Sequence, residues 1–281
     1  MISSSEIPVT QVRVGCELRL QASAPTPAVL QVQPHGEGAR GLLREQLGLV
    51  PVTAFREYRD LFGNRCQRFT LPPGETVLRY DAVVEVDARP DPAAPEAREV
   101  PVAELPDQCL AFTLPSRYCV SDLLMDAAWE RWGDHEPGWG RVQSICDWVH
   151  ENIRFQYGSS NPRTTALDVY QSRVGVCRDF TQLAVSFCRA LNIPARYVFG
   201  YLPDIGVEVH ELMDFAAWFE AYLGGRWWTF DPRNNVPRVG RAVVGKGRDA
   251  LDVSMLTTYG QVPLTGFRVW ADQVLPGETG A

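Results

Sequence analysis

The sequence predicts an α+β protein with two domains, and three observations carry this prediction. Residues 12 to 87 contain short runs rich in β-branched and aromatic residues between Pro and Gly breaks, which is typical of strands. Residues 121 to 193 change to helical spacing, and residues 195 to 232 return to strand-like runs. This order favours an N-terminal β-sandwich-like module followed by helices packed on an antiparallel sheet.

The N-terminal module takes in residues 1–105. Its strand-like runs are "VRVGCELRLQA", "AVLQVQP", "RCQRFTLP" and "TVLRYDAVVEVDA". The stretch "ARPDPAAPEAREVPVAELP", near residues 88–106, is rich in Pro, Ala and charge, which indicates a linker or a long surface crossing. We therefore expect the second domain to span residues 106–281.

Three helices are predicted at the start of the second domain. "SDLLMDAAWERW" begins with Ser121, a good N-cap residue, and places Leu123, Leu124, Ala127, Ala128 and Trp132 at helical spacing. "GRVQSICDWVHENI" repeats that pattern. "CRDFTQLAVSFCRALNI" has a third apolar face and is stopped by Asn192 and Pro194.

Composition excludes several classes of function. A net charge of −7 lacks the basic face that nucleic acids or anionic membranes require. The N-terminus lacks the pattern of a signal peptide and no apolar run approaches ~20 residues, so we expect a cytoplasmic protein. Seven cysteines without a CxxC pair, beside four histidines, disfavour a disulfide framework or a zinc site and predict no cofactor.

Cys177 is the cysteine with a setting suited to chemistry. It lies between the loop "SRVG" and the third predicted helix. The free N–H groups and the dipole at a helix N-terminus favour an anion, so they lower the pKa of a thiol and can hold an oxyanion. The alternative is a simply buried cysteine, as we expect for Cys188 in the middle of the same helix.

The stretch "FAAWFEAYLGGRWWTFDP" predicts a β-hairpin. If Gly224 and Gly225 form a two-residue turn, Leu223 pairs with Arg226, and extending the register places Trp218 opposite Asp231. Ala216 and Asp231 then lie on one face as diagonal neighbours. An aspartate before Pro232 is also a common turn starter, and both interpretations remain open at this point.

The same face carries further side chains with ordinary explanations. Trp218, Trp227 and Trp228 are expected to pack the sheet, although one of them could line a substrate groove. Glu220 could be solvated or contact a substrate.

These residues together resemble a known family. "TTALDVYQSRVGVCRDFTQLAVSFCRALNIPARYVFGYL" and the hairpin segment after it are similar to the core of bacterial transglutaminase-like proteins, and the N-terminal module resembles one found before this core in a bacterial subgroup. The resemblance implies a papain-like fold, a Cys-His-Asp triad, and a thiolate that attacks a carboxamide or peptide bond of a protein or peptide substrate. Cys177 matches the nucleophile and Asp231 the acid, while the histidine position falls on Ala216.

Ala216 has three explanations. One is natural divergence to a protein that has lost its activity, and another is an engineered inactive variant of an active enzyme. The third is a relocated base. His210 would point to the same side of an extended strand as position 216, but six residues place it ~20 Å from that position. His150 is expected to be a partly buried packing residue, and His35 and His135 are expected in loops.

Two functions follow from the sequence. The first is a thiol-dependent acyltransferase or amide hydrolase that acts through Cys177. The second, favoured by Ala216, is a transglutaminase-like protein with lost or much reduced activity that binds a protein or peptide partner. A missing general acid–base alone costs typically ~10²–10⁴-fold in rate.

Overall fold

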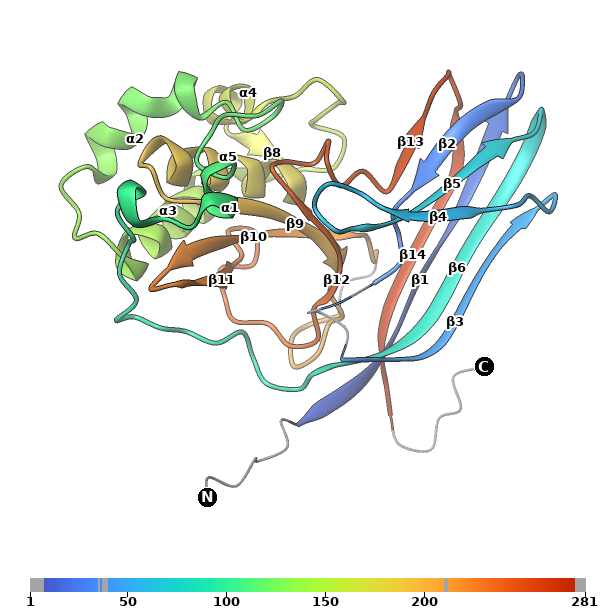
Figure 1. Ribbon diagram of the computed structural model, residues 1–281, viewed down its shortest axis with the longest axis horizontal. Helices are drawn as coiled ribbons and strands as arrows, with labels where there is room; N and C mark the ends of the chain where they lie inside the picture. The colour runs from blue at the N-terminus through green and yellow to red at the C-terminus, as the bar shows by residue number, and fades with distance from the viewer. Residues whose placement is uncertain (1–7, 35, 37–39, 210–211, 276–281) are drawn as a thin grey trace.

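The structure is a computed structural model that describes residues 8–34, 36, 40–209 and 212–275. Figure 1 shows a lobe of helices and a short sheet beside two longer, steeply inclined sheets. The α+β class and the predicted order of strands, helices and strands are confirmed.

The two longer sheets form an antiparallel sandwich. One sheet has the order β14-β1-β6-β3 and the other β13-β2-β5-β4. Their buried apolar residues, such as Leu18 and Leu78 from the first sheet and Leu30 and Leu71 from the second, form one core. The strands are β1 (Val9–Ala22), β2 (Thr26–Leu30), β3 (Gly41–Val50), β4 (Arg56–Arg59), β5 (Arg65–Leu71), β6 (Gly74–Asp87), β13 (Leu256–Thr258) and β14 (Leu264–Val274).

The last two strands return from the C-terminal part of the chain to this sandwich. β14 pairs with β1 from Gln11↔Val274 to Leu20↔Leu264, and β13 pairs with β2. The sheets of the N-terminal module are therefore not made by residues 1–105 alone. A division of the chain into domains near residue 105 remains a proposal, and it has to assign β13 and β14 to the first domain.

The crossing from the sandwich to the helices is tied to the rest of the fold. It contains η2 (Val102–Glu104), and it lies against the hairpin through a bridge between Glu99 and Leu223 and a hydrogen bond from the N–H of Gly224 to the carbonyl of Arg98. Residues 88–106 thus form a surface crossing held by backbone hydrogen bonds.

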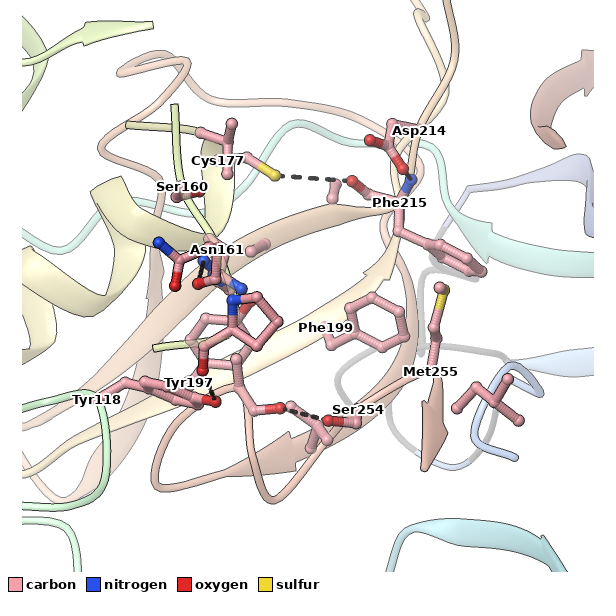
Figure 2. A pocket seen from close by; sticks show the side chains of 18 of the residues that line it. Tyr118, Ser160, Asn161, Cys177, Tyr197, Phe199, Asp214, Phe215, Ser254 and Met255 are labelled. Atoms are coloured by element: carbon pink, nitrogen blue, oxygen red, sulfur yellow. Dashed lines mark hydrogen bonds between the residues drawn. The ribbon is translucent and has the colours of Figure 1, made fainter. Parts of the chain in front are cut away.

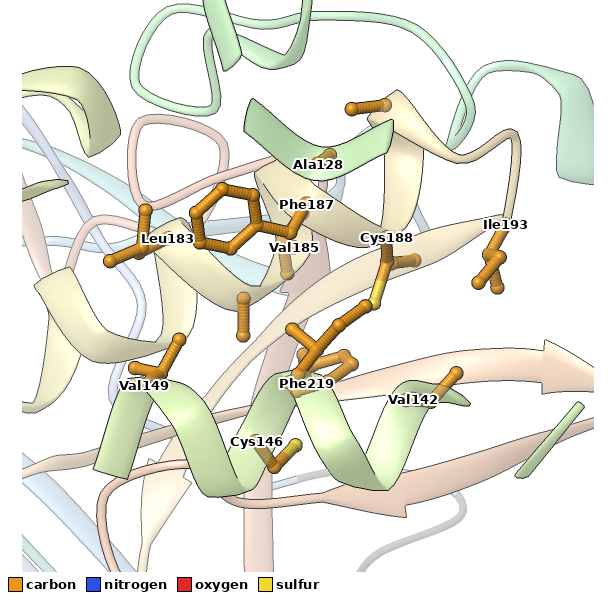
Figure 3. Close-up of a cluster of buried hydrophobic side chains, with 14 of the residues drawn as sticks. Ala128, Val142, Cys146, Val149, Leu183, Val185, Phe187, Cys188, Ile193 and Phe219 are labelled. Atoms are coloured by element: carbon orange, nitrogen blue, oxygen red, sulfur yellow. The ribbon is translucent and has the colours of Figure 1, made fainter. Parts of the chain in front are cut away.

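The second lobe packs helices on one face of the third sheet, whose order is β11-β10-β9-β12. Figure 3 shows the packing of Phe187 and Cys188 from the central helix, Val142 and Cys146 from a second helix and Phe219 from the sheet. The elements are α1 (Asp107–Leu110), η3 (Ser121–Leu124), α2 (Met125–Trp132), α3 (Trp139–Asn152), β7 (Arg154–Phe155), α4 (Ala166–Ser172), β8 (Val174–Gly175), α5 (Cys177–Ala190), β9 (Ala195–Tyr201), β10 (Ala216–Leu223), β11 (Arg226–Phe230) and β12 (Ala242–Gly247).

The three predicted helices are present, but the first begins differently. Ser121 does not cap it: the side chain is buried, and residues 121–124 form a 3₁₀ turn ahead of α2. Leu123 is exposed, because this turn rotates it away from the core that buries Leu124. The buried face predicted for α3 is confirmed through residues such as Val142 and Val149.

The predicted hairpin register is confirmed. Leu223 pairs with Arg226 and Phe219 with Phe230, and Gly224 and Gly225 adopt the positive φ angles of 57° and 86° that a tight two-residue turn requires. Asp231 is the first residue after β11.

Candidate active site

Cys177 is the first residue of α5, as the sequence predicted to within one residue. The carboxylate of Asp179 accepts a hydrogen bond from the N–H of Val176 at 2.9 Å and closes the first turn. Gly175 lets this carboxylate approach, because an added Cβ at that position would lie 2.8 Å from the Cβ of Asp179. The local sequence therefore fixes the start of the helix and the place of the thiol.

The thiol borders two cavities. The larger, of about 600 Å³, lies where the second lobe meets the sandwich, and Figure 2 shows Tyr197, Phe199, Phe215 and Met255 on its walls. The smaller, of about 180 Å³, is lined by Cys177 and by loop residues that include Arg233 and Asn234. Cys177 thus stands between two mainly apolar cavities, of which the smaller has more charged residues in its lining.

The thiol is held protonated by its surroundings. Burial and the nearby carboxylate of Asp214 raise its pKa to about 12, against the opposing effects of the Arg178 amide and the Arg233 guanidinium. The Sγ atom lies 3.8 Å from the carbonyl oxygen of Phe215, to which the thiol can donate (Figure 2). The expected lowering of the pKa by the helix N-terminus is therefore wrong in net direction, because burial outweighs the helix end.

Ala216 begins β10 and borders both cavities beside Cys177. Its side chain groups with Trp218 and Val243, whereas the next residue, Ala217, groups with Tyr197 and Cys177. The two neighbours belong to different clusters, and both border the two cavities beside Cys177.

Asp231 makes a dense set of internal contacts outside both of these cavities. It pairs with Arg241 at 2.9 Å, and it accepts hydrogen bonds from the side chain of Asn234 at 2.9 Å and from the N–H groups of Arg233 and Asn234. Arg241 also stacks on Trp218, with 4.7 Å from the guanidinium carbon to the ring centroid. Asp231 therefore starts a turn, as one of the two interpretations of the sequence expected.

The two described histidines do not supply a partner for the thiol. His35 and His210, and with His210 the relocated base, lie outside the described residues. His135 and His150 are described, and neither borders the two cavities at Cys177. His150 is exposed rather than packed, and its Nδ1 lies 3.2 Å from the carbonyl of Arg233.

Two charged residues near the thiol were missed from the sequence. Asp214 borders both cavities, and partial burial raises its pKa. Arg233 borders the smaller cavity and stacks on Phe155 at 4.1 Å. Asp214 could have been found from the sequence, because it lies two positions before Ala216 and residues two apart in an extended chain point to the same side. Nothing in the local sequence pointed to Arg233.

Glu220 is neither solvated nor at the cleft. Its carboxylate is buried between Arg196 and Lys246, the latter at 3.1 Å, so its role is structural. Across the described part of the chain, no group of three His, Cys, Asp or Glu side chains is arranged to hold a metal ion. No helix in the same residues has the length and apolar character needed to cross a membrane.

A helix-start cysteine that packs on an antiparallel sheet beside a hairpin with a following aspartate defines the class of papain-like folds. The transglutaminase-like superfamily model matches residues 130–232, which contain all of these features. The chain belongs to this superfamily.

Similar proteins cover between 79% and 97% of the chain. A crystal structure described as a "Putative Cysteine Protease from Cytophaga hutchinsonii" is 32% identical, with a TM-score of 0.87, and the match covers 97% of this chain and 93% of that one. Uncharacterised proteins from Mycobacterium leprae and Mycobacterium tuberculosis are each 28% identical. The first match covers 80% of this chain and 83% of the relative, and the second covers 79% and 78%.

Proposed function

We propose that this protein uses the cleft at Cys177 to bind a protein or peptide segment, and that the thiol acyl-transfer or hydrolysis chemistry of its family is lost or much reduced. In this proposal Cys177 and Asp231 are the remaining nucleophile and acid of an ancestral triad, and Ala216 occupies the position of the histidine. Members of the superfamily act on protein or peptide substrates, which supports a polypeptide as the occupant.

The observation that carries the proposal is that no described histidine borders the cavities at Cys177, while burial and Asp214 raise the pKa of the thiol. A pKa of about 12 leaves roughly one thiolate in 10⁵ thiols at pH 7, and the thiolate is the nucleophilic form. The charged groups near it within the described residues include the carboxylates of Asp214 and Asp179, which disfavour the thiolate, and the guanidinium of Arg233, which cannot give up its proton. None of them is the imidazole that, in a Cys-His pair, takes the proton from the thiol and returns it to a leaving amine.

The cleft nevertheless keeps the features of a binding site. The larger cavity is lined mainly by aromatic and aliphatic side chains, with a few polar groups such as Tyr118 and Asn161. This composition is typical of pockets that bind a ligand through apolar contacts and orient it with a few hydrogen bonds.

The test is to incubate the protein with a glutamine-containing peptide and an amine, and to measure ammonia release and the intact mass of the protein. Cys177→Ser, which removes the thiol, is the matched control. We expect no difference in ammonia release between the two proteins and no thioester mass. A thioester, or ammonia release that disappears in Cys177→Ser, would show an active enzyme with a base elsewhere in the chain, such as His210.

A further inference from the structure

A cavity of about 440 Å³ lies between the crossing from the sandwich and the segment that joins β11 to β12. Its described lining is rich in charge, with five arginines and two aspartates: Arg40, Arg89, Arg226, Arg238, Arg241, Asp87 and Asp91. Five positive and two negative charges leave the lining at +3, whereas the whole chain carries −7. Positive charge concentrated in one cavity of an acidic protein attracts anions.

The wall of this arginine-rich cavity is fixed by hydrogen bonds. The N–H of Asp91 donates to the carbonyl of Arg238 at 2.9 Å, and the carboxylate of Asp91 accepts from the N–H of Arg238 at 2.9 Å. The same carboxylate accepts from Nε of Arg241 at 2.9 and 3.0 Å. Pro90 and Pro92 restrict the backbone on either side of Asp91. The two arginines are therefore held in place before any ligand arrives.

These two arginines have buried donors without acceptors. The side chains of Arg238 and Arg241 are 4% and 7% exposed. Most of their N–H groups reach partners, such as Asp204 for Arg238 and Asp231 for Arg241. Within the described part of the chain, however, Nε of Arg238 and Nη1 of Arg241 are buried and have no hydrogen-bond acceptor. Buried donors are rarely left in this state, and an oxygen atom of an anion would supply the acceptor.

Three further guanidinium groups stand at the exposed side of the cavity. Arg40 and Arg89 share one carboxylate, that of Asp87, at 3.3 and 2.7 Å. Arg226 is exposed and stacks on Trp228, with 4.0 Å from the guanidinium carbon to the ring centroid. No carboxylate among the described residues forms an ion pair with Arg226. A guanidinium that is oriented by a ring keeps its N–H groups available for a ligand.

We propose that this cavity binds a phosphate group, with Arg89 and Arg226 on its exposed oxygens and the buried Arg238 and Arg241 behind them. A guanidinium donates two parallel hydrogen bonds to such oxygens, and a phosphate offers three oxygens and up to two negative charges to the +3 lining. The phosphate can be the free ion or part of a small phosphate ester, because both present the same oxygens. Cys177 does not line this cavity, so the proposal is independent of the proposed function.

The test titrates the unaltered protein into inorganic phosphate or into glycerol phosphate and follows the linewidth of the phosphorus NMR signal. Chloride holds the ionic strength near ~0.15 M, where non-specific attraction between exposed charges is largely screened. We expect saturable binding of at least one of the two. Tighter binding of the ester supports an organic phosphate as the natural source, and tighter binding of the free ion supports inorganic phosphate.

Competition by other anions tests the class of ligand. Acetate, which has one charge, should displace the phosphate at least tenfold less well than unlabelled phosphate does. Malonate, which has two carboxylates, should also compete less well. No saturable binding of either phosphate compound, or equal competition by acetate, would overturn the proposal. Tighter binding of malonate would overturn the phosphate assignment in favour of a dicarboxylate.

Two variants locate the binding. Arg226→Gln removes an exposed guanidinium from the cavity and should weaken phosphate binding at least tenfold. Arg56→Gln removes an exposed guanidinium from β4 of the sandwich, outside this cavity, and should leave binding unchanged. Circular dichroism checks that both variants are folded. Unchanged binding in Arg226→Gln, or equal losses in the two variants, would overturn the assignment to this cavity.

Discussion

Asp231 and Arg241 form a buried ion pair, with 2.9 Å between Oδ2 and Nη2 and side chains that are 3% and 7% exposed. Arg241 also pairs with Asp91 at 2.9 Å and lies over Trp218. The residue that matches the family's catalytic acid is thus part of a structural network that joins the end of the hairpin to the crossing from the sandwich.

The first prediction concerns stability. Asp231→Asn should lower the free energy of unfolding by about 3 kcal/mol, because it removes one charge of a buried pair and weakens hydrogen bonds to Arg233 and Asn234. Urea unfolding followed by circular dichroism measures the change. The control is Asp87→Asn, whose partners Arg89 and Arg40 are exposed and whose lost charge should cost less than about 1 kcal/mol. Equal effects of the two substitutions would show that the Asp231 network is not a buried structural element.

The second prediction is a gain of activity. Ala216→His should restore ammonia release from a glutamine peptide by at least roughly 10²-fold over the unaltered protein, because position 216 borders both cavities beside Cys177 and an imidazole there supplies the missing base. Ser254→His is the matched control, since it adds an imidazole to the same large cavity at the far wall (Figure 2). Activity in both variants, or in neither, would contradict the assignment of position 216 as the place of the base.

The third prediction concerns the effect of neighbouring charges on the alkylation rate of Cys177. Asp214→Asn should speed alkylation of Cys177 at pH 8 by roughly 3- to 10-fold, because the carboxylate raises the pKa of the thiol. Arg233→Gln should slow the same reaction, since the guanidinium lowers that pKa. Iodoacetamide labelling followed by mass spectrometry measures both rates. Changes of the same sign in both variants would show that general disturbance of the cleft, not charge, controls the thiol.

Local signals in the sequence were enough for several elements. The Gly224-Gly225 turn set the hairpin register, because a two-residue turn leaves one alignment of the flanking strands. The helix that starts at Cys177 was also predicted, since its apolar spacing and its stop at Asn192 are contained within one segment. The predicted triad positions, Cys177, Ala216 and Asp231, came from matching the family's motif to these elements.

Features that depend on distant residues were not predicted. β14 pairs with β1, which lies some 250 positions earlier in the chain. The periodicity of a strand predicts which faces are buried but not which other strand it pairs with. The pairing of Arg241 with Asp231 depends on the path of an irregular segment after the hairpin. The raised pKa of Cys177 reflects how much protein surrounds the thiol, which the position at a helix start does not reveal.

The central claim is that Cys177 is a thiol of raised pKa with no imidazole partner among the described residues. The other six cysteines are buried and Cys177 is half-buried, so faster labelling of Cys177 follows from its greater accessibility alone and does not test the claim. The decisive measurement is therefore the pH dependence of the rate at which iodoacetamide alkylates Cys177 in the folded protein, compared with free cysteine. We predict a rate below that of free cysteine at pH 7 that rises about tenfold per pH unit up to pH 10, as a pKa near 12 requires. A rate above that of free cysteine at pH 7, with a plateau that begins below pH 8, would contradict the account.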